Sequence, residues 1–103
     1  MSYKKTLEGV RYLVQNELDM ASENNGEWFN SAHEAYAVIL EEENELYDEY
    51  LEVERHLDKY WDSVTKDAAD TKELEEIEKR ATRCACEAIQ VAAMARKAMR
   101  WQD

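Results

Sequence analysis

Residues 31–64 read SAHEAYAVILEEENELYDEYLEVERHLDKYWDSV, and this stretch decides the fold. It contains neither glycine nor proline, and it opens with Ser31-x-x-Glu34, the pattern of a helix capping box. Apolar side chains then recur at helical spacing, and over the last six positions the intervals alternate between four and three residues, as in a two-helix seam. The stretch therefore predicts one long helix that packs against another helix. Its apolar positions are Ala35, Ile39, Leu46, Tyr50, Val53, Leu57, Tyr60 and Val64.

Two further helices are predicted, one on either side of this stretch. The first runs from about residue 2 to residue 22, where apolar side chains recur every three or four residues, and Asn24-Asn25-Gly26 ends it. The third opens at a second capping-box pattern, Asp70-x-x-Glu73, and extends to Arg100. The chain has no proline and two glycines, so strands are not expected. We predict an all-α fold: a single domain over residues 1–103, built as a bundle of three main helices.

The apolar positions exceed what one chain of this size can bury. A chain of 103 residues has a thin core of its own. The long second helix nevertheless carries aromatic and aliphatic side chains as far as Val64, and the third helix is rich in alanine, which lets a neighbouring helix approach closely. We therefore expect an obligate homo-oligomer, a homodimer or a homotetramer, in which a second copy completes the bundle.

Composition excludes several classes of function. The formal net charge is −11, so attraction to the phosphates of nucleic acid or to an anionic membrane has the wrong sign, and no direct nucleic-acid binding is expected. No stretch of about 18 apolar residues is present, and the polar start of the chain lacks the apolar segment of a signal peptide. A cytoplasmic protein without membrane contact is predicted.

Acidic residues on the two longer helices form the candidate site. Glu42 and Glu45 are three residues apart, as are Glu87 and Gln90, so each pair lies on one helix face. Three carboxylates and one amide oxygen would make an all-oxygen site of the kind that Mg²⁺ prefers, usually together with substrate phosphates. The alternative is an acidic, solvated helix face. Glu42 and Glu45 lie beside the apolar stripe rather than opposite it, where carboxylates repel one another unless a cation holds them.

The same segments carry a resemblance to a known family. Residues 31–49, quoted above, are followed by Glu87-Ala-Ile-Gln-Val-Ala-Ala-Met-Ala95. Together they resemble the MazG-like all-α nucleoside triphosphate pyrophosphohydrolases, most closely the small single-domain versions of bacteria and phages. The signature of that family is two adjacent glutamates, two spacers and a third glutamate, followed later by Glu-x-x-Asp.

The match to this signature implies a role for each residue. Glu41, Glu42 and Glu45 match its first half, Glu87 matches the start of its second half, and Gln90 replaces its aspartate. The resemblance implies cleavage between the α- and β-phosphates of a nucleoside triphosphate, with Mg²⁺, or Mn²⁺ as a substitute, and release of monophosphate and pyrophosphate. Glu42, Glu45 and Glu87 would ligate the metal with Gln90 as a neutral fourth ligand. Glu41 would either lie in the outer shell of the metal or act as the base that orients the attacking water, and it would act with Glu42 in catalysis.

Three residues outside the acidic group are candidates for contact with the nucleotide substrate. Arg83 shares a helix face with Glu87 and could contact a phosphate, or it could form a plain salt bridge. His33 precedes the acidic run and could contact a phosphate, or it could simply lie near a helix N-terminus. Trp28 could stack on a base at the mouth of the site, or it could cap the end of the bundle.

These features predict a Mg²⁺-dependent nucleotide pyrophosphohydrolase that serves nucleotide-pool housekeeping. The alternative belongs to another class: a non-catalytic acidic helical protein that binds a protein partner or mimics the charge of nucleic acid. Gln90 favours this alternative, because the loss of a metal-binding acid is how a hydrolase fold would lose its activity.

Overall fold

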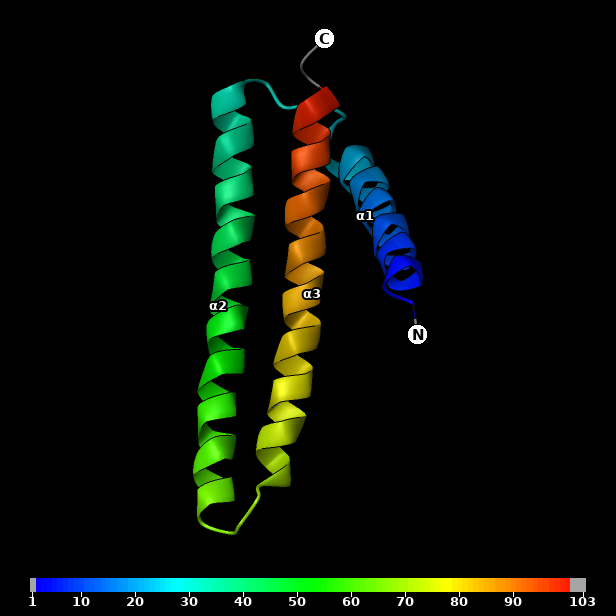
Figure 1. Ribbon diagram of the computed structural model, residues 1–103. Helices are drawn as coiled ribbons and strands as arrows, with labels where there is room; N and C mark the ends of the chain where they lie inside the picture. The colour runs from blue at the N-terminus through cyan, green and yellow to red at the C-terminus, as the bar shows by residue number, and fades with distance from the viewer. Residues whose placement is uncertain (1, 101–103) are drawn as a thin grey trace. The chain divides into compact units, whose positions relative to one another are not determined.

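The computed structural model describes residues 2–100, and this range contains three helices and no strand (Figure 1). Helix α1 spans Tyr3–Asn25, α2 spans Ala32–Thr65 and α3 spans Thr71–Arg100. The all-α prediction is confirmed, and the predicted helix ends differ from the observed ones by three residues at most. No helix within the described range combines the length and the apolar character needed to cross a membrane.

Helix α1 continues about one turn beyond its predicted end and stops at Asn25. Gly26 follows with φ 86°, a positive value that glycine adopts at little cost. Its N–H donates a hydrogen bond to the Ser22 carbonyl at 3.1 Å. The glycine therefore ends the helix as the sequence indicates.

The start of α2 is capped by the residues of its predicted capping box. The Ser31 hydroxyl accepts a hydrogen bond from the Glu34 N–H at 3.1 Å. The Glu34 carboxylate in turn accepts a hydrogen bond from the Asn30 N–H at 2.6 Å, one residue earlier than the usual pattern. These two bonds fix both the helix start and the position of the Glu34 side chain.

At the start of α3 only half of the predicted capping box forms. Asp70 Oδ1 accepts a hydrogen bond from the Lys72 N–H at 2.9 Å. Glu73, the second member of the pattern, instead contacts the imidazole of His56 on α2. A local sequence pattern was therefore overridden by a tertiary contact.

The structure falls into two compact units. Unit 1 comprises Met1–Glu43 and Ala88–Asp103, and unit 2 comprises Asn44–Glu87. Unit 1 contains α1, the first part of α2 and the last part of α3. Its buried core is formed by Val14, Leu18, Phe29, Ala35, Ala93 and Met94.

Unit 2 is a helical hairpin in which the later part of α2 and the first part of α3 are joined by residues 66–70 (Figure 1). Two helices can bury little apolar surface, and several large apolar side chains of this hairpin remain exposed, including Leu57 of the predicted seam. Leu57 is 54% exposed, Trp61 63% and Leu74 44%. The buried polar residue of the hairpin is His56, which is 6% exposed. Ion pairs between side chains therefore help to hold its two helices together.

Candidate metal centre

Three of the predicted acidic ligands come together. Glu42 and Glu45 lie one turn apart on α2, Glu87 lies on α3, and each offers one carboxylate oxygen. These three oxygen atoms all lie within 4.8 Å of one another. Glu42 and Glu87 are partly buried, whereas Glu45 is exposed. Because α2 continues without a break through this region, the three-residue spacing places the first two carboxylates on one face. Such a group can hold one hard divalent cation through oxygen.

Glu87 is the acid whose environment most favours a bound cation. Its Oε2 atom is buried and has no hydrogen-bond partner among the described residues. Burial raises the pKa of Glu87, and a hydrogen bond with Glu45 and the negative charges of Glu45 and Glu49 raise it further. A carboxylate is thus held among other carboxylates at a cost in free energy. A divalent cation would satisfy the orphaned oxygen and offset the repulsion, so the residues present fit such an ion.

The other residues predicted to bind the metal or a phosphate, or to activate water, are Glu41, Gln90 and His33. Glu41 is exposed on α2 and does not belong to the group of three. Gln90 is partly buried on α3, one turn after Glu87. Its role as a fourth ligand stays a prediction. His33, at the second residue of α2, is exposed.

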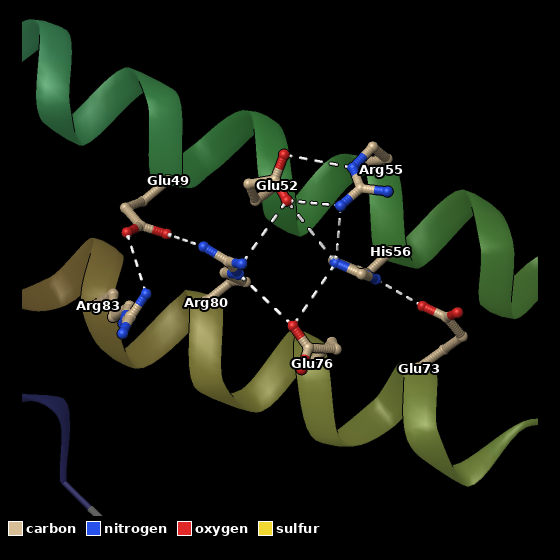
Figure 2. Close-up of polar contacts among 8 residues, drawn as sticks. All are labelled: Glu49, Glu52, Arg55, His56, Glu73, Glu76, Arg80 and Arg83. Carbon is tan, nitrogen blue, oxygen red and sulfur yellow. Dashed lines mark hydrogen bonds and ion pairs between the residues drawn. The ribbon is translucent and has the colours of Figure 1, made fainter.

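An arginine-rich network joins the two helices of unit 2 (Figure 2). Glu49, one turn after Glu45, forms an ion pair with Arg80 at 3.3 Å and with Arg83 at 4.0 Å. The salt bridge considered for Arg83 is therefore present. The ion pair is long, it is the one ion pair or hydrogen bond that Arg83 forms among residues 2–100, and the side chain is 54% exposed. The Arg83 guanidinium accordingly remains accessible to an anionic ligand.

No family model, curated protein or solved structure matches this chain. The resemblance to MazG-like enzymes stays a prediction. A metal site is supported by the three carboxylates, by the buried Glu87 oxygen that lacks a hydrogen-bond partner, and by the adjacent arginines.

His56 is the central residue of the network, and the sequence analysis did not single it out. Its Nδ1 contacts the Glu73 carboxylate at 2.5 Å (Figure 2). Its Nε2 lies 3.8 Å from Glu52 and 3.7 Å from Glu76. The Arg55 guanidinium lies 3.3 Å from the same nitrogen. The one available sequence signal was its position three residues after an apolar seam residue, Val53, which places it toward the facing helix.

Arg80 extends this network from the α3 side. Its guanidinium lies 3.6 Å from Glu76 and 4.0 Å from Glu52, in addition to the contact with Glu49. A hydrogen bond from Arg55 lowers the pKa of Glu52, and the positive charges of Arg55, Arg80 and His56 lower it further. Positive and negative groups of the two helices lie next to one another, so the network ties α2 to α3 within unit 2.

Removal of the Glu73 carboxylate is expected to destabilise the protein. Glu73→Ala leaves the buried Nδ1 of His56 without its partner, which should cost about 1–3 kcal/mol. This exceeds the roughly 0.3–1 kcal/mol that a first-turn carboxylate contributes through the helix dipole. Urea unfolding followed by circular dichroism measures the difference. Glu75→Ala, at an exposed position two residues later, is the matched control. Equal stabilities of the two variants would contradict a structural role for the pair.

Proposed function

We propose that this protein hydrolyses nucleoside triphosphates, or related nucleotides, to a monophosphate and pyrophosphate with the help of Mg²⁺. The observation that carries the proposal is the group of Glu42, Glu45 and Glu87, whose oxygen atoms lie within 4.8 Å of one another. The buried, unpartnered Oε2 of Glu87 supports it, because a purely solubilising acidic face would not bury a carboxylate oxygen without a partner.

Each acidic residue of such a site would have its own role in metal binding or in the activation of water. Glu42, Glu45 and Glu87 would hold the ion, and Gln90 would add a neutral oxygen. When bound, Mg²⁺, or Mn²⁺ in its place, would neutralise phosphate charge. The exposed Glu41 carboxylate would orient the attacking water and accept its proton, with Glu42 beside it in the sequence.

Arg83 is the proposed phosphate contact. Its guanidinium pairs with Glu49 at 4.0 Å, and a phosphate oxygen could replace that carboxylate oxygen without leaving the arginine unpaired. The exposed His33 is a second candidate for phosphate contact. Trp28 is the candidate for contact with the base, since it is 60% exposed. Each of these three side chains is thus proposed to contact the nucleotide substrate.

Release of pyrophosphate, as opposed to orthophosphate, tests this proposal. The purified protein would be incubated with a panel of ribo- and deoxyribonucleoside triphosphates, with Mg²⁺ and separately with Mn²⁺. We expect pyrophosphate with at least one nucleotide, and none after chelation of the metal. If no nucleotide is hydrolysed and the protein responds to divalent cations only as to ionic strength, the alternative function holds: a non-catalytic acidic protein that binds a partner or mimics nucleic acid.

We also propose that the protein is a homodimer or homotetramer. Unit 2 leaves Tyr50, Leu57, Trp61 and Leu74 between 44% and 63% exposed, and large apolar surfaces on soluble proteins usually mark interfaces. A second copy would cover these side chains.

Leu57→Glu is therefore expected to weaken the assembly. Burial of one leucine side chain contributes about 1.5–3 kcal/mol, so the dissociation constant should rise by about tenfold or more. Sedimentation velocity across a concentration series measures this. Ala68→Glu adds the same charge at an exposed loop position and should leave assembly unchanged. A wild-type protein that is a stable monomer at low micromolar concentration would contradict the proposal.

A further inference from the structure

Unit 1 contains a cavity of about 260 Å³ that the proposed metal site does not use. Its walls come from the end of α1, the following loop, α2 and α3. Trp28 and Phe29 supply aromatic surface, Val38 and Met94 supply aliphatic surface, and Glu34 and Lys97 supply opposite charges. The volume is just below the roughly 300 Å³ at which sites for drug-sized ligands begin, so the cavity suits one heterocyclic ring system.

Lys97 is an unusual residue for such a wall. It is 4% exposed, yet it forms no ion pair or hydrogen bond with any residue that the structure describes. Its ammonium group lies over the ring of Phe29, whose centroid is 4.5 Å from Nζ. Nζ is not one of the fully buried atoms of residues 2–100 that lack a partner, so it keeps some access to solvent. A cation–π contact leaves its N–H groups without an acceptor. The ammonium therefore has hydrogen-bond donors available to a ligand in the cavity.

Glu34 lines the same cavity and carries a charge opposite to that of Lys97. Its carboxylate is fixed by hydrogen bonds from Asn30, at 2.6 Å from the backbone N–H and 3.4 Å from the side-chain amide. It does not form an ion pair with Lys97, although both residues line the cavity. A lysine can only donate hydrogen bonds and an ionised glutamate can only accept them. Together they complement a ligand edge on which an acceptor oxygen stands beside an N–H donor.

The aromatic residues favour a flat ligand. Phe29 is 5% exposed and forms part of the core, while Trp28 beside it is 60% exposed and lines the cavity. An exposed indole next to a cavity is a surface on which a heterocycle can stack, and stacking on an aromatic side chain contributes regardless of the identity of the base. The discrimination between rings must then come from Lys97 and Glu34.

The cavity and the first metal-binding acid share one face of α2. Glu34, Val38 and Glu42 follow one another at intervals of four residues within unit 1. Four residues of α-helix rise about 6 Å, so a ligand ring beside Val38 lies about one turn from the Glu42 position along the helix.

We propose that this cavity binds the base of the nucleotide, and that Lys97 and Glu34 select bases that carry an oxo group next to a ring N–H. Guanine, hypoxanthine, uracil and thymine have that edge. Adenine and cytosine present an amino donor next to a ring acceptor, which would place a donor against Lys97 and an acceptor against Glu34. The nucleotide part of this inference rests on the proposed function, whereas the preference for the ring does not.

Nucleosides without phosphates, in the presence of EDTA, test the cavity separately from the metal site. Inosine and adenosine differ at the purine edge where one has an oxo group and the other an amino group. Binding to the full-length protein would be followed by calorimetry and by the indole NMR signal of Trp28. We expect inosine to bind about tenfold or more tightly than adenosine. In Lys97→Met the two affinities should fall within about twofold of each other. Lys59→Met, at an exposed position of α2, should retain the wild-type preference.

A second variant covers the case in which Lys97→Met does not fold. Glu34→Gln keeps the helix cap, since glutamine also serves in a capping box, but it adds donors to the cavity and should reduce the preference for inosine. Equal affinities for the two nucleosides in the wild-type protein, persistence of the preference in Lys97→Met, or no binding of either nucleoside up to about 10 mM would each overturn the proposal. Absence of pyrophosphate release with an intact preference for inosine would instead refute the proposed function alone.

Discussion

Changing Glu42, Glu45 or Glu87 to glutamine is expected to abolish tight divalent-cation binding and to lower pyrophosphate release by at least about a hundredfold. Each change removes one of three carboxylates whose oxygen atoms lie within 4.8 Å of one another. The helical content should not change. The stability of the metal-free protein should stay the same or rise slightly, because each change removes charge from a site of mutual repulsion.

Steady-state assays, calorimetry with Mg²⁺ and circular dichroism on the same preparations separate these effects. Glu54→Gln is the matched control, because Glu54 is an exposed glutamate of α2 outside the acidic group. If all three variants at the site retain wild-type turnover, the assignment of the site is wrong. If they lose turnover together with helical content, the residues act on the fold rather than on the ion.

The affinity for Mg²⁺ is expected to rise with pH over the range in which Glu87 ionises. Burial, with contributions from Glu45 and Glu49, places the pKa of Glu87 above its usual value of 4.5. A protonated carboxyl must lose its proton before it ligates a metal, so binding releases a proton below that raised pKa. The apparent affinity should therefore fall by about tenfold for each pH unit below the raised pKa, and should level off above it.

The stability of the metal-free protein should show the opposite trend. Between pH 4.5 and the raised pKa, the folded protein binds a proton at Glu87 that the unfolded chain does not bind. The free energy of unfolding should therefore fall as pH rises through this window. Thermal unfolding with EDTA at a series of pH values measures it. Glu87→Gln, which cannot ionise, should lose this part of the pH dependence. An unchanged pH profile in that variant would contradict the raised pKa.

The helices could be predicted from the sequence because the features that fix them are local. Ser31 and Asp70 supply caps within three residues of the helix starts, and Gly26 supplies the positive φ that ends α1. The meeting of Glu42, Glu45 and Glu87 was predictable in part. The spacing of three residues places Glu42 and Glu45 on one face of α2 and Glu87 and Gln90 on one face of α3, but it does not fix which residues of the two helices meet.

Contacts that depend on the register of one helix against another could not be predicted. His56 and Glu73 are 17 residues apart, and which residues meet across the hairpin depends on where residues 66–70 turn the chain. The capping pattern in fact assigned the Glu73 carboxylate to the helix end, not to His56. The burial of Lys97 could not be predicted either, because a lysine near the end of a helix is expected at the surface. In the structure it is buried, and its ammonium group lies over the ring of Phe29.

Counting bound Mn²⁺ by electron paramagnetic resonance tests the central claim most directly, because the signal of the free ion disappears on binding. We predict one tightly bound ion per wild-type chain and none in the double variant of Glu45→Gln with Glu87→Gln. A control with Glu54→Gln and Glu75→Gln, which removes the same charge from exposed positions, should bind one ion. Equally weak binding in all three proteins, falling only with ionic strength, would show that the acids attract cations as a diffuse charge and would contradict the metal centre.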